Sequence, residues 1–154
     1  MSTIKNEMKL EFLSRSANEA FARISVAAFA SQLDPTIEEI ADIKTSVSEA
    51  VTNSIIHGYP DYDGIVKVVT RIAENEIEIE VSDNGVGIEN IEEARALLFT
   101  TKTNLERSGM GFTIMENFMD NLKVESISGL GTKITMKKKI KSHERKESKY
   151  IEIK

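Results

Sequence analysis

The 154-residue sequence predicts an α/β fold, a two-layer sandwich with helices on one face of a mostly antiparallel, mixed sheet. Two long segments, residues 16–33 and 36–57, repeat apolar side chains at helical spacing. The segment Glu76-Ile-Glu-Ile-Glu-Val alternates strictly, as in a strand with one buried face and one wet face. Two further strands, 121–128 and 132–140, flank a glycine turn, and together these elements fill two layers.

Composition restricts the class of protein. The length suits one domain, and the absence of cysteine excludes disulfides, iron–sulfur clusters and thiolate zinc sites. No apolar run reaches the roughly 18–20 residues that span a bilayer, and residues 1–7 lack a signal-peptide core, so we expect a cytoplasmic protein with no membrane contact. The net charge of −5 argues against nucleic acid as a direct ligand.

The last 18 residues differ in charge from the rest. Residues 137–154 carry eight Lys and Arg against three Asp and Glu, so the first 136 residues are strongly acidic. We expect a domain over residues 1–136, and a segment 137–154 that holds the end of the last strand and a basic, flexible tail. This tail is either a solvated end or a weak docking arm for an acidic partner.

The first half of the chain predicts one strand and two helices. Residues 8–13 alternate as a short strand. Ser16 with Glu19 is a capping-box pattern for the first helix, and Thr36 with Glu39 is one for the second. Gly58 and Pro60 end the second helix, whose apolar stripe is Ile37, Ile40, Val47, Val51 and Ile55.

The second half predicts a hairpin, two shorter helices and a second strand pair. Residues 64–73 and 76–82 are strands around a turn at Glu74-Asn75. A short helix is expected at 92–98, a loop at 99–108 and a helix at 111–119, with Ile114, Met115 and Phe118 as its core candidates.

Glu49 and Asn53 are the first pair of candidate site residues. They are four apart on a helix, so their side chains lie on one face. An amide oxygen suits Mg²⁺ that takes its other ligands from phosphates and water, and a carboxylate nearby can accept a proton from an attacking hydroxyl. The alternative is the solvated face of an amphipathic helix.

Asp83 ends an expected buried strand and opens Asp83-Asn-Gly-Val-Gly87. Its carboxylate can accept a hydrogen bond from the exocyclic amine of adenine. Gly85 and Gly87 let the backbone approach a flat base closely. The alternative is an ordinary Asp-Asn-Gly turn.

Gly109-Met-Gly111 is expected directly before a helix, where backbone N–H groups bind phosphate. The preceding loop is rich in phosphate-binding side chains and could close as a lid over a triphosphate. The alternative is a mobile surface loop. The candidate phosphate contacts are Thr100, Thr101, Lys102, Arg107, Ser108, Gly109 and Gly111.

Other nucleotide motifs are absent from the sequence. It has no P-loop, no dinucleotide fingerprint, and neither the His-Arg-Asp nor the Asp-Phe-Gly signature of ordinary protein kinases. His57 is interpreted as a helix-end residue rather than a phosphoacceptor.

Taken in order, the motifs at Glu49–Asn53, Asp83–Gly87, Gly109–Gly111 and Gly129–Thr132 resemble the N, G1, G2 and G3 boxes of the GHKL ATPases, which include gyrase, Hsp90, histidine kinases and MutL. The resemblance covers about residues 8–136 and implies a GHKL (Bergerat) fold that binds ATP and Mg²⁺. Ser48-Glu-Ala-Val-Thr-Asn, Leu98-Phe-Thr-Thr-Lys and Glu106-Arg-Ser-Gly-Met-Gly-Phe resemble the anti-sigma-factor serine kinases of sporulation and stress response.

That resemblance implies roles residue by residue. Glu49 would be the catalytic base, Asn53 the magnesium ligand, and Asp83 the adenine contact, with Gly87 and Thr132 helping through water. Residues 100–111 would form the ATP lid. Arg23 matches a position that contacts both protein partners.

The resemblance also implies partners. They are a sigma factor of the sigma-F type, held inactive, an anti-anti-sigma factor with a STAS domain that is phosphorylated on serine, and a second copy of the chain in a homodimer. The alternative function is a nucleotide-dependent sigma-factor switch without efficient catalysis. A chaperone-type ATPase would need extra domains, and a histidine kinase would need a phosphoacceptor helix.

Overall fold

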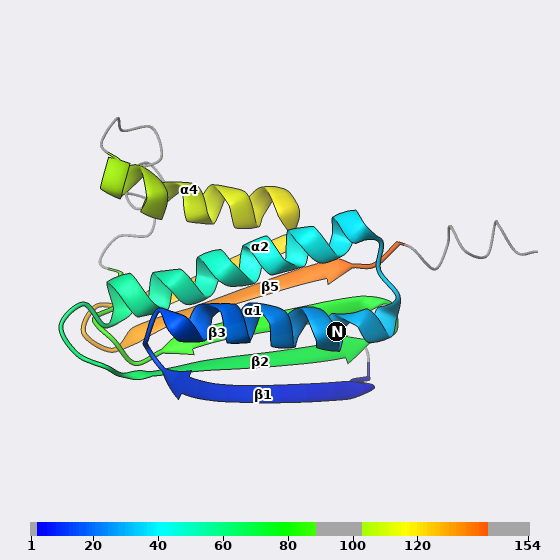
Figure 1. The fold of residues 1–154 in the computed structure, drawn as a ribbon, viewed down its shortest axis with the longest axis horizontal. Helices are drawn as coiled ribbons and strands as arrows, with labels where there is room; N and C mark the ends of the chain where they lie inside the picture. Colours follow the sequence, from blue (N-terminus) through cyan, green and yellow to red (C-terminus); the bar gives the residue numbers. More distant parts are fainter. Residues whose placement is uncertain (1–2, 89–102, 142–154) are drawn as a thin grey trace, which may run out of the picture.

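The chain forms one five-stranded sheet with helices packed on one face (Figure 1). The computed structural model describes residues 3–88 and 103–141, with only the backbone for 103–110. The strand order is β1-β2-β3-β5-β4, and all four pairings are antiparallel. The predicted two-layer sandwich is therefore confirmed, and the sheet is antiparallel rather than mixed over its described strands.

The first strand and helix lie close to their predicted positions. β1 spans Asn6–Leu13, and α1 spans Ala17–Ala30 before one 3-10 turn, η1, at Ser31–Leu33. The predicted capping box at Ser16 is wrong, because Ser16 has helical backbone angles and its side chain caps nothing. A cap residue needs extended angles to turn its hydroxyl toward the first turn.

The second helix carries the capping box that the sequence predicts. α2 spans Ile37–Asn53; the Thr36 hydroxyl accepts the Glu39 N–H at 3.1 Å, and the Glu39 carboxylate accepts the Thr36 N–H at 2.9 Å. Ile37 was expected in the buried stripe but is 88% exposed. It lies about 120° around the helix from the buried Ile43, which explains its exposure.

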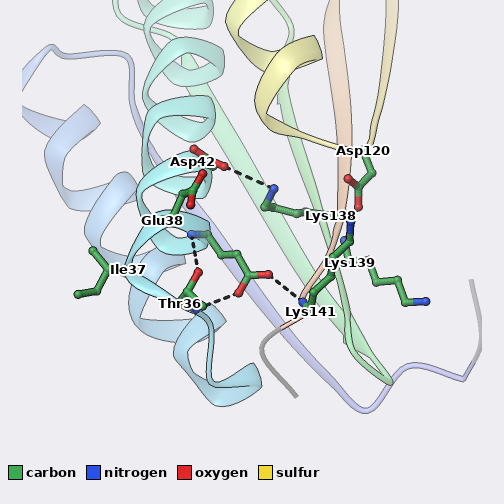
Figure 2. A pocket seen from close by; sticks show the side chains of 9 residues that line it. Thr36, Ile37, Glu38, Asp42, Asp120, Lys138, Lys139 and Lys141 are labelled. Atoms are coloured by element: carbon green, nitrogen blue, oxygen red, sulfur yellow. Dashed lines mark hydrogen bonds and ion pairs between the residues drawn. The ribbon is translucent and has the colours of Figure 1, made fainter. Parts of the chain in front are cut away.

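Glu39 also joins α2 to the backbone of Lys141, which follows the last described strand (Lys141 is labelled in Figure 2). Its second carboxylate oxygen accepts the Lys141 N–H at 2.8 Å, and Lys138 Nζ lies 3.6 Å from Asp42 on the next turn. Glu39 is only 8% exposed, so this end of the molecule is held by a buried carboxylate that is fully hydrogen-bonded.

The remaining elements complete the sheet. β2 (Ile65–Ala73) and β3 (Glu76–Asp83) form the predicted hairpin, and Glu74 has a positive φ of 55° in its turn. α4 spans Thr103–Phe118, and β4 and β5 follow at Asn121–Ile127 and Gly131–Lys139. The loop expected over 99–108 is wrong from residue 103 onward, where the chain is helical; the expected helix at 92–98 lies outside the described residues.

The core lies between the helices and one sheet face. Its fully buried side chains come from α1, α2, α4 and the three central strands, and include Val26, Val47, Met115, Ile77, Ile134 and Met136. The opposite sheet face is charged and has no helix packed on it within the described ranges. Its acidic and basic side chains pair across neighbouring strands. Among the described helices, none is both long and apolar enough to cross a membrane.

Candidate active site

Asp83 lies at the centre of the described part of the site. It ends β3 and is 6% exposed. One carboxylate oxygen accepts the Ser54 hydroxyl at 2.7 Å, and the other accepts the Gly85 N–H at 3.0 Å. Each oxygen keeps a second lone pair. The buried Asp83 carboxylate can therefore still accept a hydrogen bond from a ligand.

Glycines let three backbone segments converge around Asp83. A Cβ at Gly85 would lie 1.9 Å from the Gly58 carbonyl oxygen, and one at Gly131 would lie 2.1 Å from the Asp83 carbonyl oxygen. A Cβ at Gly58 would meet the Asp83 carboxylate at 3.0 Å. No side chain fits in these gaps, so the glycines allow these backbone segments to pack directly on one another. The approach of Gly85 to a flat base stays a prediction.

Tyr59 supports the Asp83-Asn84 turn through its hydroxyl. Its hydroxyl accepts the Asn84 N–H and donates to the Ile65 carbonyl, both at 2.7 Å. Burial raises the pKa of Tyr59; the hydrogen bond from Asn84 opposes this, while the Asp83 carboxylate adds to it. The phenol therefore stays protonated and keeps the Asp83-Asn84 turn in place.

Thr132 and Gly87 lie on the β4–β5 side of the site. Thr132 pairs with Asp83 in the sheet register and is 5% exposed. Its hydroxyl lies 2.9 Å from the Ser126 hydroxyl, which accepts the Ile88 N–H at 2.6 Å. Gly87 has a positive φ of 75°, and a Cβ there would lie 2.3 Å from the Ile127 carbonyl oxygen, so only glycine fits the turn.

Glu49 and Asn53 lie on the last two turns of α2 and are both half-buried. Directly after Asn53 the helix widens into one π-turn, η2, over Ser54–Gly58. Such π-turns commonly mark functional sites, because they redirect side chains at a helix end. Ser54 then bonds Asp83, so the structure brings the Glu49–Asn53 pair and the Asp83 turn into one place.

Gly111 approaches Glu49 from α4, which packs against α2 (Figure 1). A Cβ at Gly111 would lie 3.0 Å from Glu49 Oε2. Gly109-Met-Gly111 was expected at the start of a helix, but it lies inside α4, which begins two turns earlier at Thr103. Inside a helix, the backbone N–H groups of this motif donate to helical hydrogen bonds. The expected helix start at Gly109-Met-Gly111 is therefore wrong.

The lid residues are only partly described. Thr100, Thr101 and Lys102 lie outside the described residues, and of Arg107, Ser108 and Gly109 the backbone alone is placed, within α4. Arg23 lies apart from the Asp83 turn, on α1, where its Nε donates to Glu19 Oε2 at 2.9 Å.

Sequence reasoning missed four supporting residues: Ser54, Gly58, Tyr59 and Ser126. Each has a partner at least 25 residues away in the chain, so no local pattern marks it. Only Ser54 had a usable signal, since it directly follows Asn53 at the predicted end of the helix.

The donor set fits the predicted ligands. No group of three or more His, Cys, Asp or Glu side chains in the described ranges could hold a metal by itself. A magnesium ion that is carried by phosphates needs only one or two protein oxygens, and the Asn53 amide can supply one. The Asp83 carboxylate suits the amine edge of adenine.

Comparisons with known proteins agree with this geometry. The histidine kinase-like ATPase domain family matches residues 12–138. The anti-sigma F factor of Clostridium novyi is 64% identical over 140 residues, covering 90% of this chain and 98% of that protein. The anti-sigma F factor of Clostridium acetobutylicum is 61% identical over 136 residues, covering 88% and 95%.

Solved structures match the fold at low identity. The RsbU and RsbW domains of a Mycobacterium tuberculosis protein align with a TM-score of 0.63 at 17% identity, over 88% of this chain and 32% of that one. A blue-light-activated histidine kinase domain of Erythrobacter litoralis aligns with a TM-score of 0.53 at 19% identity, over 82% and 63%. The two-layer fold, the nucleotide-binding ATPase domain and the relatives together show that the chain belongs to the histidine kinase-like (GHKL) ATPases, in the anti-sigma F factor (SpoIIAB-type) family.

Proposed function

We propose that this protein is an ATP-dependent protein serine kinase and an anti-sigma factor. It binds and inhibits a sigma factor of the sigma-F type and phosphorylates a serine of an anti-anti-sigma partner with a STAS domain. The observation that carries the proposal is the Ser54–Asp83 hydrogen bond, which joins the Glu49–Asn53 helix end to the Asp83 turn. The relatives named anti-sigma F factor support the choice of partners.

The nucleotide end of the proposed site is the Asp83 turn. Asp83 accepts the adenine amine, and the backbone of Gly85, whose N–H donates to Asp83, lies beside the base. Gly87 and Thr132 contact it through water, which the Thr132–Ser126 hydroxyl pair is suited to hold. Burial of Asp83 strengthens this hydrogen bond, because little water competes for the carboxylate.

The reactive end is the last two turns of α2. When bound, ATP with Mg²⁺ supplies the phosphoryl group and neutralises its charge, and Asn53 holds the ion through its amide oxygen. Glu49 accepts the proton of the partner's serine hydroxyl as the serine attacks. Gly111 leaves the Glu49 carboxylate space to hold that position.

The remaining proposed contacts belong to the lid and the partner surface. The side chains of Thr100, Thr101, Lys102, Arg107 and Ser108 bind the phosphates as a lid, hinged near Gly109 and Gly111. Arg23 contacts the protein partners, and the chain acts as a homodimer in the cytoplasm.

Incubation with labelled ATP, Mg²⁺ and the anti-anti-sigma protein tests the proposal. We expect phosphoserine on the partner, and the Glu49→Gln variant should lose at least about 100-fold in rate while keeping nucleotide affinity. Ser31→Ala, an exposed change in η1 directly after α1, serves as the control. Sigma-factor binding without phosphoserine would instead indicate a nucleotide-dependent switch without efficient catalysis.

A further inference from the structure

Asn84-Gly85 is the only Asn-Gly pair in the sequence, and it lies in the turn that directly follows Asp83. The Asn84 side chain is exposed to solvent, and no described residue hydrogen-bonds its amide group. An asparagine before glycine is chemically labile, because glycine has no Cβ to keep its own backbone nitrogen away from the preceding side chain. The turn at the proposed nucleotide site therefore contains a reactive amide.

The reaction open to such a pair is deamidation. The backbone nitrogen of Gly85 loses its proton to solvent base and attacks Asn84 Cγ, so that an N–Cγ bond forms, the Cγ–Nδ2 bond breaks and ammonia leaves. Water then opens the resulting succinimide ring. Attack of water at Cγ gives aspartate with the original main chain, whereas attack at the backbone carbonyl carbon gives isoaspartate, whose main chain runs through Cβ and Cγ. Asparagine and water are thereby converted to a carboxylate and ammonia.

Two hydrogen bonds oppose ring closure in the folded chain. The Gly85 N–H donates to Asp83 Oδ1 at 3.0 Å, so the proton that must leave is held by a carboxylate whose negative charge disfavours an anion beside it. The Asn84 N–H donates to the Tyr59 hydroxyl at 2.7 Å. The turn must open before the Gly85 nitrogen can react, so the free energy of this local opening controls the rate.

The closed turn has no room for the longer backbone of isoaspartate. A Cβ on Gly131 would lie 2.9 Å from Asn84 Cα, and a Cβ on Gly85 would lie 1.9 Å from the Gly58 carbonyl oxygen. Isoaspartate inserts a methylene group between these packed segments, so the turn cannot close around it and Asp83 loses its position. Aspartate keeps the original backbone and only adds a charge at an exposed position.

From these observations we propose that Asn84 is a site of spontaneous deamidation whose rate is set by the hydrogen bonds of the Asp83–Gly85 turn. Isoaspartate at this position abolishes nucleotide binding. Bound ATP slows the reaction, because it holds the turn closed through Asp83. The modification itself follows from the turn geometry, whereas its effect on ATP binding and its suppression by ATP rest on the proposed function of Asp83.

Incubation of the full-length protein at mildly alkaline pH, followed by peptide mass spectrometry and enzymatic methylation of isoaspartate, tests the site. We expect Asn84 to be modified at least about tenfold more slowly in the folded protein than in the urea-unfolded chain. Tyr59→Phe, which removes the acceptor of the Asn84 N–H, should speed modification of the folded protein about fivefold. Tyr62→Phe removes an exposed hydroxyl from the neighbouring ring and should keep the wild-type rate.

Measurements with ATP test the consequence for the site and do not depend on the folding of Tyr59→Phe. Saturating ATP with Mg²⁺ should slow modification of the wild-type protein at least about tenfold. The fraction of ATP-binding sites that the incubated wild-type protein loses, measured by calorimetry, should equal its isoaspartate content. Asn84→Gln, whose longer side chain closes the corresponding ring poorly, should show no such loss.

The outcomes separate this proposal from the proposed function. Equal modification rates in the folded and urea-unfolded chains, a wild-type rate in Tyr59→Phe, or no modification of Asn84 in either protein overturns the proposal. Modification that responds to Tyr59→Phe but not to saturating ATP leaves the modification site standing and refutes adenine binding by Asp83. If Asn84→Gln loses ATP binding as fast as wild type, the proposed effect of isoaspartate is wrong.

Discussion

Gly111 of α4 faces Glu49 of α2 so closely that a Cβ on Gly111 would lie 3.0 Å from Glu49 Oε2. Few side-chain methyls approach an oxygen at that distance, so alanine there would push the carboxylate aside. The second glycine of Gly109-Met-Gly111 therefore leaves space for the proposed catalytic base, whereas the sequence had suggested a backbone contact to phosphate.

Gly111→Ala should therefore separate stability from activity. Alanine in a helix interior is favoured over glycine by up to about 1 kcal/mol, which offsets the tight contact, so stability should change little. Transfer of phosphate to the partner should fall about tenfold or more, because Glu49 is displaced. Asn117→Ala, at an exposed position of α4, is the control and should keep the full rate. An unchanged rate in Gly111→Ala would show that phosphate transfer tolerates a shift of the Glu49 carboxylate.

Ser54→Ala should weaken nucleotide binding and the fold together. The change removes the hydroxyl that donates to Asp83 at 2.7 Å and leaves a buried carboxylate oxygen short of a donor, at a cost of about 1–3 kcal/mol. Calorimetry of ATP binding and urea unfolding measure the two effects.

Ser46→Ala offers a matched control for that change. Ser46 is also a buried serine, on α2, but its hydroxyl has no hydrogen-bond partner among the residues that the structure describes. Its removal should be neutral or slightly stabilising, with ATP affinity unchanged. Equal losses in the two variants would mean that the Ser54–Asp83 bond has no special role.

Local patterns predicted most of the fold, and long-range contacts account for what they missed. Thr36 and Glu39 form their capping box because both partners lie within one turn. The strand of alternating Glu76 to Val81 lies where its period places it. Spacing alone predicts Ile37 in the buried stripe. The buried stripe winds around the helix, however, and Ile37 lies exposed to solvent.

The site was predictable to a similar degree. Asp83 and the Glu49–Asn53 pair can be singled out as candidates from the sequence because their motifs are local. The π-turn after Asn53 and the donors Ser54 and Tyr59 were not, since each depends on a segment that the fold brings in from elsewhere. The start of α4 was misplaced because glycines at 109 and 111 resemble a helix boundary, whereas packing on α2 holds them in a helix.

Glu39→Ala should destabilise the protein by about 2 kcal/mol or more. It removes the acceptor for the Thr36 N–H and also the acceptor for the Lys141 N–H, which joins α2 to the end of β5. Urea unfolding measures the loss. Glu38→Ala, at the exposed neighbouring position, removes only a charge near the helix start and should cost less than about 1 kcal/mol. Similar losses in both variants would reduce the role of Glu39 to that helix-dipole effect.

Glu80, on the charged sheet face, should make stability depend on acid pH. Burial by itself raises the pKa of Glu80, but hydrogen bonds from Lys133 and Arg71 outweigh it and hold the pKa below its ordinary value. The unfolded chain then binds the proton more readily than the folded chain. The stabilisation from Glu80 is thus complete above the unfolded pKa of about 4.3 and is lost as the pH falls through the folded value.

Comparing Glu80→Gln with wild type at several pH values measures that linkage. At pH 7 the variant should be less stable by about 1–2 kcal/mol, because it loses a charge that Arg71 and Lys133 both bind. The difference should shrink as the pH is lowered below about 4, where the wild-type carboxylate also becomes neutral. Glu125→Gln, whose exposed side chain pairs with Lys123 at 3.3 Å, should show a smaller difference at every pH. A Glu80→Gln difference that stays constant from pH 7 to pH 3 would mean that shape and packing, and not charge, hold Glu80 in place.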